Sequence, residues 1–343
     1  MPVMLDWVGA RGIRWTSDEV FNGGTVLSLS PAGEIEYRTE RRMVVEGSHS
    51  ANITIRGGGG HIELSGNPAK FLQGHNLFGS SDLKPLMARA LEVIADRLGH
   101  VPTPEDRLSW HRGGYELHRL DITGMIDCGS PQRVRKVLNV LGQVARTKYQ
   151  GALTDSGTVY IGQRSRRFKL KFYDKGAEIR KHPLSVTMSP DWHQKLTAWA
   201  AGKLRAELTL GSQWFHDNSD FRSARWWDAD FPSQLLNSRL EVLEVSDAMR
   251  LDEDSVLSLP PKLVAIYDAW QAGRDLQALY SRPTFYRYRR QLLDLAGIDI
   301  AHVQPREIIT ETQYIGGEPI GALLRGPRVG IPEWARGTDL LAS

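Results

Sequence analysis

The amino-acid sequence predicts an α+β fold, in which helices lie on one face of a mostly antiparallel sheet and a helical domain follows at the C-terminal end. Three observations support this prediction. The first third contains short alternating or β-branched runs separated by Gly, Pro, Asn and Ser, which is typical of strands joined by turns. Helical and strand-like segments then alternate through the middle of the chain. From about Leu235 the pattern becomes helical.

The strands expected in the first third are short. The tetraglycine Gly57–Gly60 lies between two of them and is interpreted as a hairpin tip. It lacks the Gly-Lys-Ser/Thr ending and the following helix of a phosphate-binding loop. The five expected strands are Thr25–Leu29, Ile35–Arg38, Met43–Val45, Ala51–Ile55 and His61–Leu64.

Residues 67–79 combine Pro, Gly, Lys, His and amide side chains, between a strand-like run and a long helical one. We interpret them as a polar bend that buries little core. Ser81 and Asp82 can then cap a helix that runs to about Leu98. Further elements are the strand Tyr115–Thr123, the helix Gln132–Ala145, the antiparallel pair Thr158–Ile161 and Phe168–Tyr173, and the strand Leu204–Leu210.

The chain divides at a change of character near residues 231–259. An acidic stretch, Asp247–Asp254, precedes the sequence Leu259-Pro260-Pro261, after which a new helix begins. We therefore predict an α+β domain at residues 1–235, a linker region at 236–258 and a helical domain at 259–343. The tail after Val303 is rich in Gly and Pro and is expected to wrap the surface.

Composition excludes several classes of protein. The 343 residues include 43 basic and 40 acidic side chains, so the net charge of +3 does not by itself indicate nucleic acid. A single cysteine, Cys128, excludes an internal disulfide or a cysteine-based metal cluster. No apolar run reaches the roughly 18 residues of a membrane span, and a signal-peptide core is absent. We expect a soluble, intracellular protein without a membrane partner.

Two of the expected strands carry an Arg-x-acid pattern. Strand alternation puts Arg119 and Asp121 on one face with Leu117 and Thr123, opposite His118, Leu120 and Ile122. In Leu204–Leu210, the residues Arg205, Glu207 and Thr209 share a face. If the two strands are neighbours, two carboxylates suited to Mg²⁺ or Mn²⁺ meet two guanidiniums suited to phosphate. A cross-strand salt bridge or a structural charge ladder remains the alternative.

A third segment places lysines around a tyrosine. In a regular strand Lys169, Lys171, Tyr173 and Lys175 lie on one face. We expect these lysines to lower the pKa of the tyrosine hydroxyl and to bind phosphate, which are the conditions for a tyrosine nucleophile acting on a phosphodiester. An amphipathic surface strand is the alternative.

The C-terminal region predicts a helix-turn-helix. Helices are expected at Lys262–Ala272, Asp275–Tyr280 and Thr284–Leu295, with Pro283 at a first helical position and Gly297 after the last helix. The short connection and the basic face favour contact with the major groove over a solvated bundle helix. The apolar face of the last helix has Phe285, Tyr288, Leu292 and Leu295, and the basic face has Thr284, Tyr286, Arg287 and Arg290.

Together these segments resemble the phage/plasmid replication protein II/X family, the gene II replication initiators of filamentous bacteriophages. The resemblance covers about residues 45–215 and weakens afterwards to Phe285-Tyr286-Arg287-Tyr288. Its most specific part is the Gln-Gly-His-Asn-x-Phe-Gly run. The matching pieces are Pro68-Ala69-Lys70, Leu72–Gly79, Asp82-Leu83, Arg119-Leu120-Asp121, Tyr173-Asp174-Lys175 with Glu178, and Leu204-Arg205-Ala206-Glu207.

The resemblance implies a fold of the divergent rolling-circle nuclease type and a nickase that acts on a double-stranded origin through a 5′-phosphotyrosine intermediate and later rejoins the strand. Tyr173 becomes the nucleophile, and Asp121 and Glu207 become the ligands of Mg²⁺ or Mn²⁺. Lys175 joins the catalytic residues. His75 is either a third ligand or general acid, or it fixes the bend by hydrogen bonds. Phosphate oxygens are expected to contact Arg119, Arg205, Lys171 and Lys175.

The expected partners are double-stranded origin DNA, its nicked single strand and host replication proteins, in the cytoplasm of a bacterial host. The His-hydrophobic-His metal motif of better-known rolling-circle nucleases does not occur, since His118-Arg119-Leu120 ends in Leu. A non-catalytic origin-binding or regulatory protein is the alternative, and a small-nucleotide phosphodiesterase is a remote third. A separation of more than about 10 Å between Tyr173 and the two carboxylates would argue against the enzyme.

Overall fold

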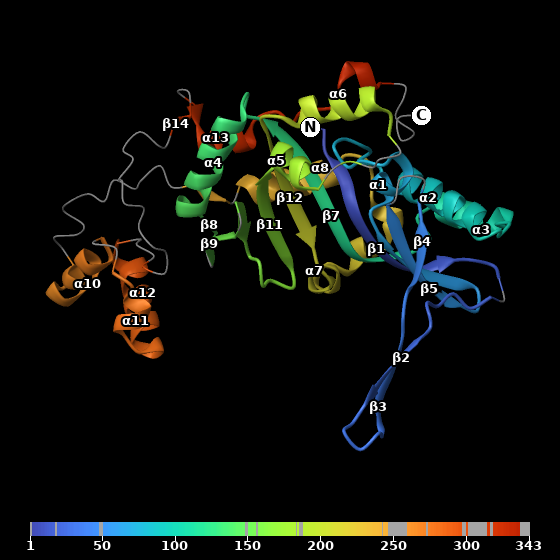
Figure 1. Ribbon diagram of the computed structural model, residues 1–343, viewed down its shortest axis with the longest axis horizontal. Coiled ribbons are helices and arrows are strands. Elements are labelled where there is room, and N and C mark those ends of the chain that lie inside the picture. The colour runs from blue at the N-terminus through green and yellow to red at the C-terminus, as the bar shows by residue number, and fades with distance from the viewer. Residues whose placement is uncertain are drawn as a thin grey trace.

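The structure of the protein is a computed structural model, and its main feature is a large antiparallel sheet (Figure 1). In the described part of the chain it has eleven strands, in the spatial order β13 (Glu244–Val245), β8 (Ala145–Thr147), β9 (Gln150–Asp155), β10 (Thr158–Ile161), β11 (Phe168–Asp174), β12 (Lys203–Leu210), β7 (Glu116–Asp127), β1 (Met4–Arg14), β6 (His61–Gly66), β5 (Asn52–Gly58) and β4 (Met43–Glu46). The structure describes residues 2–17, 19–47, 51–147, 150–155, 157–182, 184, 188–241, 243–245, 259–271, 274–296, 300, 314–315 and 318–336.

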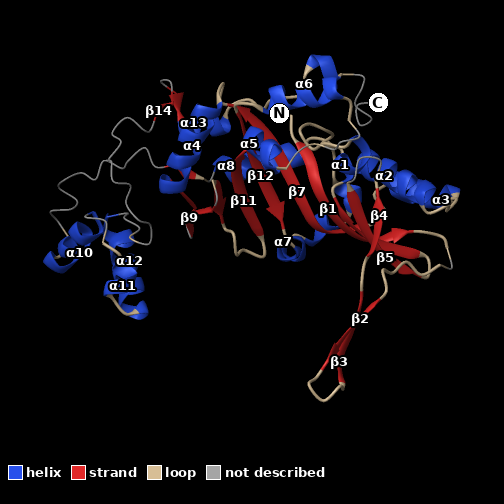
Figure 2. Ribbon diagram, in the orientation of Figure 1, coloured by secondary structure: helices blue, strands red, loops and turns tan. Residues whose placement is uncertain are grey.

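Helices pack on the apolar face of this sheet and confirm the predicted α+β class (Figure 2). Side chains of the strands, such as Leu64, Leu120 and Leu208, form one buried cluster with side chains of the helices. Burial of this apolar surface is the main favourable contribution to folding. The helices that contribute to the cluster are α1 (Pro68–Gln73), α2 (Leu83–Arg97), α3 (Pro104–His111), α4 (Pro131–Val144), α7 (Ser212–Asp217), α8 (Phe231–Glu241) and α13 (Ile320–Arg325).

Most of the expected elements lie where the sequence predicts them. Helix α2 begins after Asp82, whose carboxylate accepts a hydrogen bond from the Lys84 backbone N–H, as an N-cap residue should. Strands β10 and β11 form the predicted antiparallel pair. The sequence reasoning missed β1, because its two glycines, Gly9 and Gly12, and its charged residues interrupt the alternation that identifies a strand.

The prediction of a polar bend at residues 67–79 is partly wrong, because the segment contains helix α1 and buries apolar side chains. Asn67 caps this helix by accepting a hydrogen bond from the Lys70 N–H, and Gly74, at φ 82°, ends it in the left-handed region. Phe71 and Phe78 are buried. The apolar residues fall at short intervals that suit one helical turn and the loop after it.

Strand β7 departs from regular alternation, so the predicted faces are wrong at Leu117 and at His118. His118 was expected beside Leu120 and Ile122 but lies near the charges of Glu63 and Arg42. Leu117 is buried in the same core as Leu120 and Ile122, although regular alternation puts it on the opposite face. The cause is an irregularity in the pairing with β1, where Arg119 lies opposite Gly9 but Leu117 lies opposite Ala10. The extra residue reverses the alternation at this point, as in a β-bulge.

The helical region consists of α10 (Pro261–Gln271), α11 (Leu276–Leu279) and α12 (Arg282–Ala296), which have an apolar core of their own. Phe285, Tyr288 and Leu292 point into this core, as expected. The expected position of Leu295 on the apolar face is wrong: Leu295 is 59% exposed, because it lies in the last turn, beyond the helices that cover this face. Ala272 and Gly297 lie outside the described residues.

The described part of the tail returns to the sheet. Leu323 and Leu324 of α13 belong to the main core, and the Val329 N–H donates a hydrogen bond to the Met125 carbonyl at 2.9 Å. The division of the chain did not anticipate these contacts, and its boundaries at 1–235, 236–258 and 259–343 remain predictions. Residues 246–258 lie outside the described part. Among the described helices, none is both long and apolar enough to cross a membrane.

Two pairs of strands lie outside the main sheet in the described part of the chain. The short strands β14 (Tyr314–Ile315) and β15 (Glu318–Pro319) form one pair. β2 (Thr25–Leu29) and β3 (Ile35–Glu40) pair only with each other and form a hairpin, which we call the arm. Figure 1 shows the arm projecting from the end of the sheet near β4 and β5. Its strands match the expected positions.

Candidate active site on the sheet

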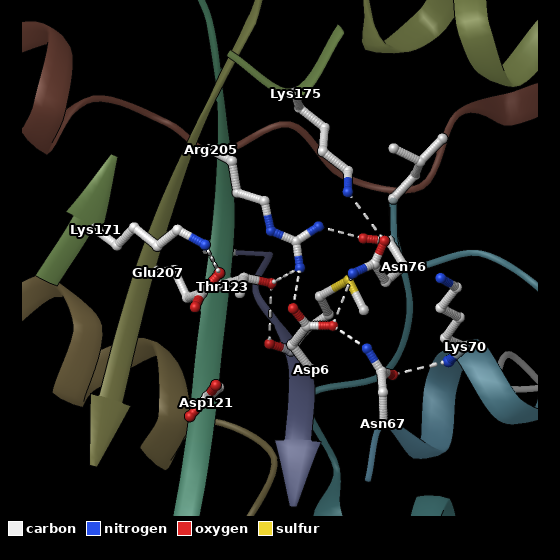
Figure 3. A network of polar contacts seen from close by, with 12 residues as sticks. Asp6, Asn67, Lys70, Asn76, Asp121, Thr123, Lys171, Lys175, Arg205 and Glu207 are labelled. Carbon is white, nitrogen blue, oxygen red and sulfur yellow. Dashed lines mark hydrogen bonds and ion pairs between the residues drawn. The ribbon is translucent and has the colours of Figure 1, made fainter. Parts of the chain in front are cut away.

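The predicted site residues meet where four neighbouring strands lie side by side. β11, β12, β7 and β1 are consecutive in the sheet, so the two strands with the Arg-x-acid pattern are direct neighbours. Glu207 lies opposite Thr123, and Thr209 lies opposite Asp121. On the other side of β12, Tyr173 lies opposite Arg205. The condition set by the sequence for a shared site is therefore met (Figure 3).

Tyr173 contacts one of the two carboxylates. Its hydroxyl donates a hydrogen bond to Glu207 Oε2 at 3.4 Å. The ammonium of Lys171 lies 4.4 Å from the centre of the tyrosine ring and 3.8 Å from the same Glu207 oxygen. Tyr173 is therefore far closer to a carboxylate than the roughly 10 Å limit beyond which shared chemistry would fail.

The expected pKa of Tyr173 is wrong in direction. Burial raises the pKa of this hydroxyl well above its usual value of 10, against an opposing effect of Arg205, and the charge of Glu207 raises it further. Of the three lysines, Lys171 faces the ring and Lys175 binds elsewhere. The hydroxyl thus needs a proton acceptor to become a nucleophile.

Both carboxylates are held in an environment that disfavours their charge. Burial, followed by the charge of Asp6, raises the pKa of Glu207 despite the opposing effects of Lys171 and Arg205. Burial also raises the pKa of Asp121, although Arg119 lowers it. A hard divalent cation would stabilise the charged forms of Asp121 and Glu207, and carboxylate oxygens are its preferred ligands. Within the described residues, however, no cluster of three His, Cys, Asp or Glu side chains has the arrangement of a metal site.

Arg119 and Asp121 form the ion pair that the strand pattern left open. The guanidinium donates two hydrogen bonds to the carboxylate, from Nε to Oδ1 at 3.1 Å and from Nη2 to Oδ2 at 2.7 Å. Arg119 also lies over the ring of Trp7, 5.0 Å from its centre. Its side chain remains 40% exposed, so it can also approach a phosphate.

Arg205 is bound within the protein. Its Nη2 donates hydrogen bonds to Asp6 Oδ2 at 2.7 Å and to Thr123 Oγ1 at 3.1 Å, and its Nη1 donates to the Asn76 carbonyl. The side chain of Arg205 is 0% exposed. Although burial alone raises the pKa of Asp6, the charge of Arg205 and a hydrogen bond from Asn76 hold it below its ordinary value of 3.8.

Asn76 links this pair to Lys175. Its side-chain amide donates to Asp6 Oδ1 at 3.0 Å and accepts from Lys175 Nζ at 3.0 Å. Lys175 also binds Glu178 Oε2 at 2.7 Å. Burial, reinforced by the charge of Arg205, lowers the pKa of Lys175 to about 8. This pKa lies closer to neutral pH than the usual 10.5 of a lysine.

His75 lies buried in the loop after α1. The Leu77 backbone N–H donates to its Nδ1 at 3.4 Å, and its ring packs against Phe78 with the ring centres 4.6 Å apart. These contacts are those expected from the bend-fixing alternative. The alternative roles in metal binding or proton transfer stay predictions.

The predicted DNA-binding side chains lie on α12. Tyr286, Arg287 and Arg290 are exposed, and Thr284 is half-buried with its hydroxyl bonded to Ser281. They therefore form a surface opposite the core of the helical region.

The sequence reasoning missed Asp6, Asn67 and Asn76 as members of the site. Asn67 donates a hydrogen bond to Asp6 from the cap of α1, so the bend and β1 are joined at this carboxylate (Figure 3). The available signal was an acidic residue inside the apolar run Met4-Leu5-Asp6-Trp7-Val8, since a buried acid needs partners.

Comparisons with known proteins match the part of the chain that contains this site. A family profile described as "Replication-associated protein G2P N-terminal" matches residues 4–233, and one described as "Replication-associated protein G2P C-terminal" matches 251–313. The replication-associated protein G2P of Enterobacteria phage I2-2 is 32% identical over 310 residues, which are 87% of this chain and 88% of that protein. A rolling circle replication initiator protein from Geobacillus stearothermophilus aligns with 13% identity and a TM-score of 0.33, over 74% of this chain and 89% of that one.

Proposed function

The chain belongs to the family of replication-associated G2P proteins, and from this membership we propose that it initiates rolling-circle replication by nicking one strand of a phage or plasmid origin. The observation that carries the proposal is the hydrogen bond between the Tyr173 hydroxyl and Glu207. A nucleophile beside a base is the arrangement that covalent catalysis needs.

The proposed reaction exchanges one phosphodiester for another. The Tyr173 oxygen attacks the scissile phosphorus, and its proton passes to Glu207. A tyrosine–phosphate bond to the 5′ side forms, while the bond from phosphorus to the 3′ oxygen breaks, and the released 3′ oxygen takes up a proton. Rejoining is the reverse transfer, in which a 3′-OH attacks the phosphotyrosine. Lys175, whose pKa is about 8, is the candidate donor of the leaving group's proton.

The surrounding groups would bind the phosphate. The partly exposed Arg119 and Lys171 are suited to its oxygens. If Mg²⁺ or Mn²⁺ takes part, Asp121 and Glu207 would hold it, and the ion would polarise the scissile phosphate. Origin DNA and its nicked strand are the proposed partners, together with host replication proteins in the bacterial cytoplasm.

We expect Glu207→Gln and Asp121→Asn to lose nicking activity and to keep DNA binding. A missing general base costs about 10²–10⁴-fold in rate. Because a base must be ionised, wild-type nicking should increase with pH as Glu207 loses its proton, at a pH above the usual 4.5 of a glutamate. Nicking rates across pH and metal concentration, with binding by fluorescence anisotropy, measure both effects.

The control for these variants is Glu116→Gln, which removes a carboxylate of the exposed Arg11–Glu116 pair on the same strand as Asp121. It should nick normally. Equal losses of binding and nicking in the two site variants would assign Asp121 and Glu207 to folding or to phosphate contact and would contradict their catalytic roles.

We further propose that α12 contacts duplex DNA as the recognition helix of a helix-turn-helix. Arg287→Ala should weaken binding to all duplexes and reduce the dependence of log K on log[salt] by about 0.9, the change expected when one phosphate contact is lost. Gln291→Ala, an exposed position on the same helix, is the matched control. An unchanged salt dependence in Arg287→Ala would remove this residue from the interface.

A further inference from the structure

Exposed apolar side chains are concentrated around the arm. Fourteen large hydrophobic residues are strongly exposed in the described part of the chain, and half of them lie between residues 20 and 44. Such a concentration marks an interaction surface more often than a free one. The seven residues are Val20, Val26, Leu27, Leu29, Ile35, Tyr37 and Val44.

The arm has no support of its own. β2 and β3 hydrogen-bond only to each other, and the arm projects away from the main sheet (Figure 1). An isolated two-stranded ribbon is at best marginally stable in water, whereas three or more strands with an apolar face are stable. A further strand added to the arm would therefore stabilise it and cover its side chains.

The two edges of the arm differ. β3 carries Glu36 and Arg38, and its pairing with β2 is irregular at Glu36, whose carboxylate accepts a hydrogen bond from Ser28 Oγ at 2.9 Å. Charges and bulges are what protect an edge strand against pairing with another chain. β2, with the sequence Thr-Val-Leu-Ser-Leu, has neither a charge nor a proline. The edge of β2 is therefore the one that can pair with a strand of another chain.

The charge of the arm does not favour a nucleic-acid partner. From Thr25 to Arg42 the arm and its foot have three acidic residues and three basic ones, so there is no basic excess: Glu34, Glu36 and Glu40 against Arg38, Arg41 and Arg42. Arg42, at the foot of the arm, is paired with Glu63. Binding to the phosphate backbone depends on an excess of basic side chains. A protein strand is therefore the better occupant.

We propose that the arm is a dimerisation element, in which β2 pairs antiparallel with β2 of a second copy of this chain. The strand is complementary to itself: with Leu27 on the two-fold axis, Val26 lies opposite Ser28 of the second copy, and no like charges meet. The contact is isologous, as in most homodimers. It produces a four-stranded sheet and places Leu27 and Leu29 of both copies on one face. The proposal does not depend on the nicking chemistry.

Charge variants at the axis test the pairing. The wild type should dimerise with increasing concentration in sedimentation velocity without DNA. Leu27→Glu and Leu27→Lys should each remain monomeric, since like charges then face each other, whereas their equimolar mixture should form a heterodimer. Leu108→Glu is the control, because Leu108 on α3 has the same 49% exposure as Leu27. It should dimerise like the wild type.

Cysteine cross-linking tests the register. Directly opposed residues in an antiparallel pair have Cα atoms about 4.5–5.5 Å apart, within the range of a disulfide. Oxidised Leu27→Cys should therefore give a covalent dimer, and Ser28→Cys, which faces Val26, should not. The native Cys128 is buried.

Two results would overturn the proposal: a wild type that stays monomeric, or a dimer that persists in Leu27→Glu. If the wild type stays monomeric and Leu27→Glu binds DNA more weakly than Leu108→Glu, the arm is a nucleic-acid contact instead. Nicking by the same variants is measured separately, so that failure of the dimer and failure of the nickase assignment are distinguished.

Discussion

Tyr173→Phe should abolish nicking of supercoiled origin DNA and the covalent protein–DNA adduct, while DNA binding stays intact. Loss of a nucleophile of this kind lowers the rate by at least about 10⁴-fold. The fold should tolerate the change, because phenylalanine keeps the buried ring and removes only the hydroxyl that binds Glu207 at 3.4 Å. Agarose gels follow the nicking, denaturing gels with labelled DNA detect the adduct, and anisotropy reports binding.

The matched control is Tyr160→Phe. Tyr160 lies on the neighbouring strand β10, opposite Lys171, and is the nearest alternative tyrosine along the sheet. This variant should nick and form the adduct normally; a defect confined to rejoining would give Tyr160 a part in a second transfer. Normal nicking by Tyr173→Phe would show that the nucleophile is a different residue, and would favour an origin-binding role for this site.

Local patterns predicted the strands of the site well. In β12, alternation alone places Arg205, Glu207 and Thr209 on one face, and the apolar opposite face ties that strand to the core. The same reasoning works for Arg119 and Asp121, because the irregularity of β7 lies just before them. Adjacency of the strands could not be derived, since pairing depends on contacts far apart in sequence.

The sequence could not predict which residues pair with the charged side chains of the site. Arg205 binds Asp6, which is 199 residues away, and Lys175 binds Asn76, which is 99 residues away. The direction of the Tyr173 pKa was wrong for the same reason: three lysines nearby in the sequence indicate a lowered pKa, but burial is the largest effect on this hydroxyl and raises its pKa against the opposing charge of Arg205. Electrostatic properties follow from desolvation, which only the folded structure reveals.

The family motif at residues 67–79 acquires a physical explanation in this structure. Asn67 and Asn76 both donate hydrogen bonds to Asp6, and Asn76 also bonds to Arg205 and Lys175. The segment therefore joins β1 to β12 and to the start of α5 (Lys175–Lys181). It positions the site, while the proposed chemistry belongs to Tyr173 and the carboxylates.

Asp6→Ala should be among the most destabilising substitutions in the sheet. It removes the only carboxylate that forms an ion pair with Arg205 among the described residues, and the side chain of Arg205 is 0% exposed. Breaking a buried pair costs about 3–5 kcal/mol. Urea denaturation should show this loss in the free energy of unfolding. Glu116→Ala is the control: it breaks the Arg11–Glu116 pair, whose side chains are both 48% exposed, and should cost at most about 1 kcal/mol.

The pH dependence of the free energy of unfolding distinguishes the contribution of the Asp6 charge from that of its side-chain packing. Because folding lowers the pKa of Asp6, its charge contributes stability above the ordinary pKa of 3.8, and this contribution is lost as the pH falls through the folded-state value. The stability difference between the wild type and Asp6→Asn, which keeps the size of the side chain, should therefore be largest near neutral pH and shrink below about pH 4. A difference that stays constant over this range would mean that Asp6 stabilises the fold by packing and neutral hydrogen bonds rather than by its charge on Arg205.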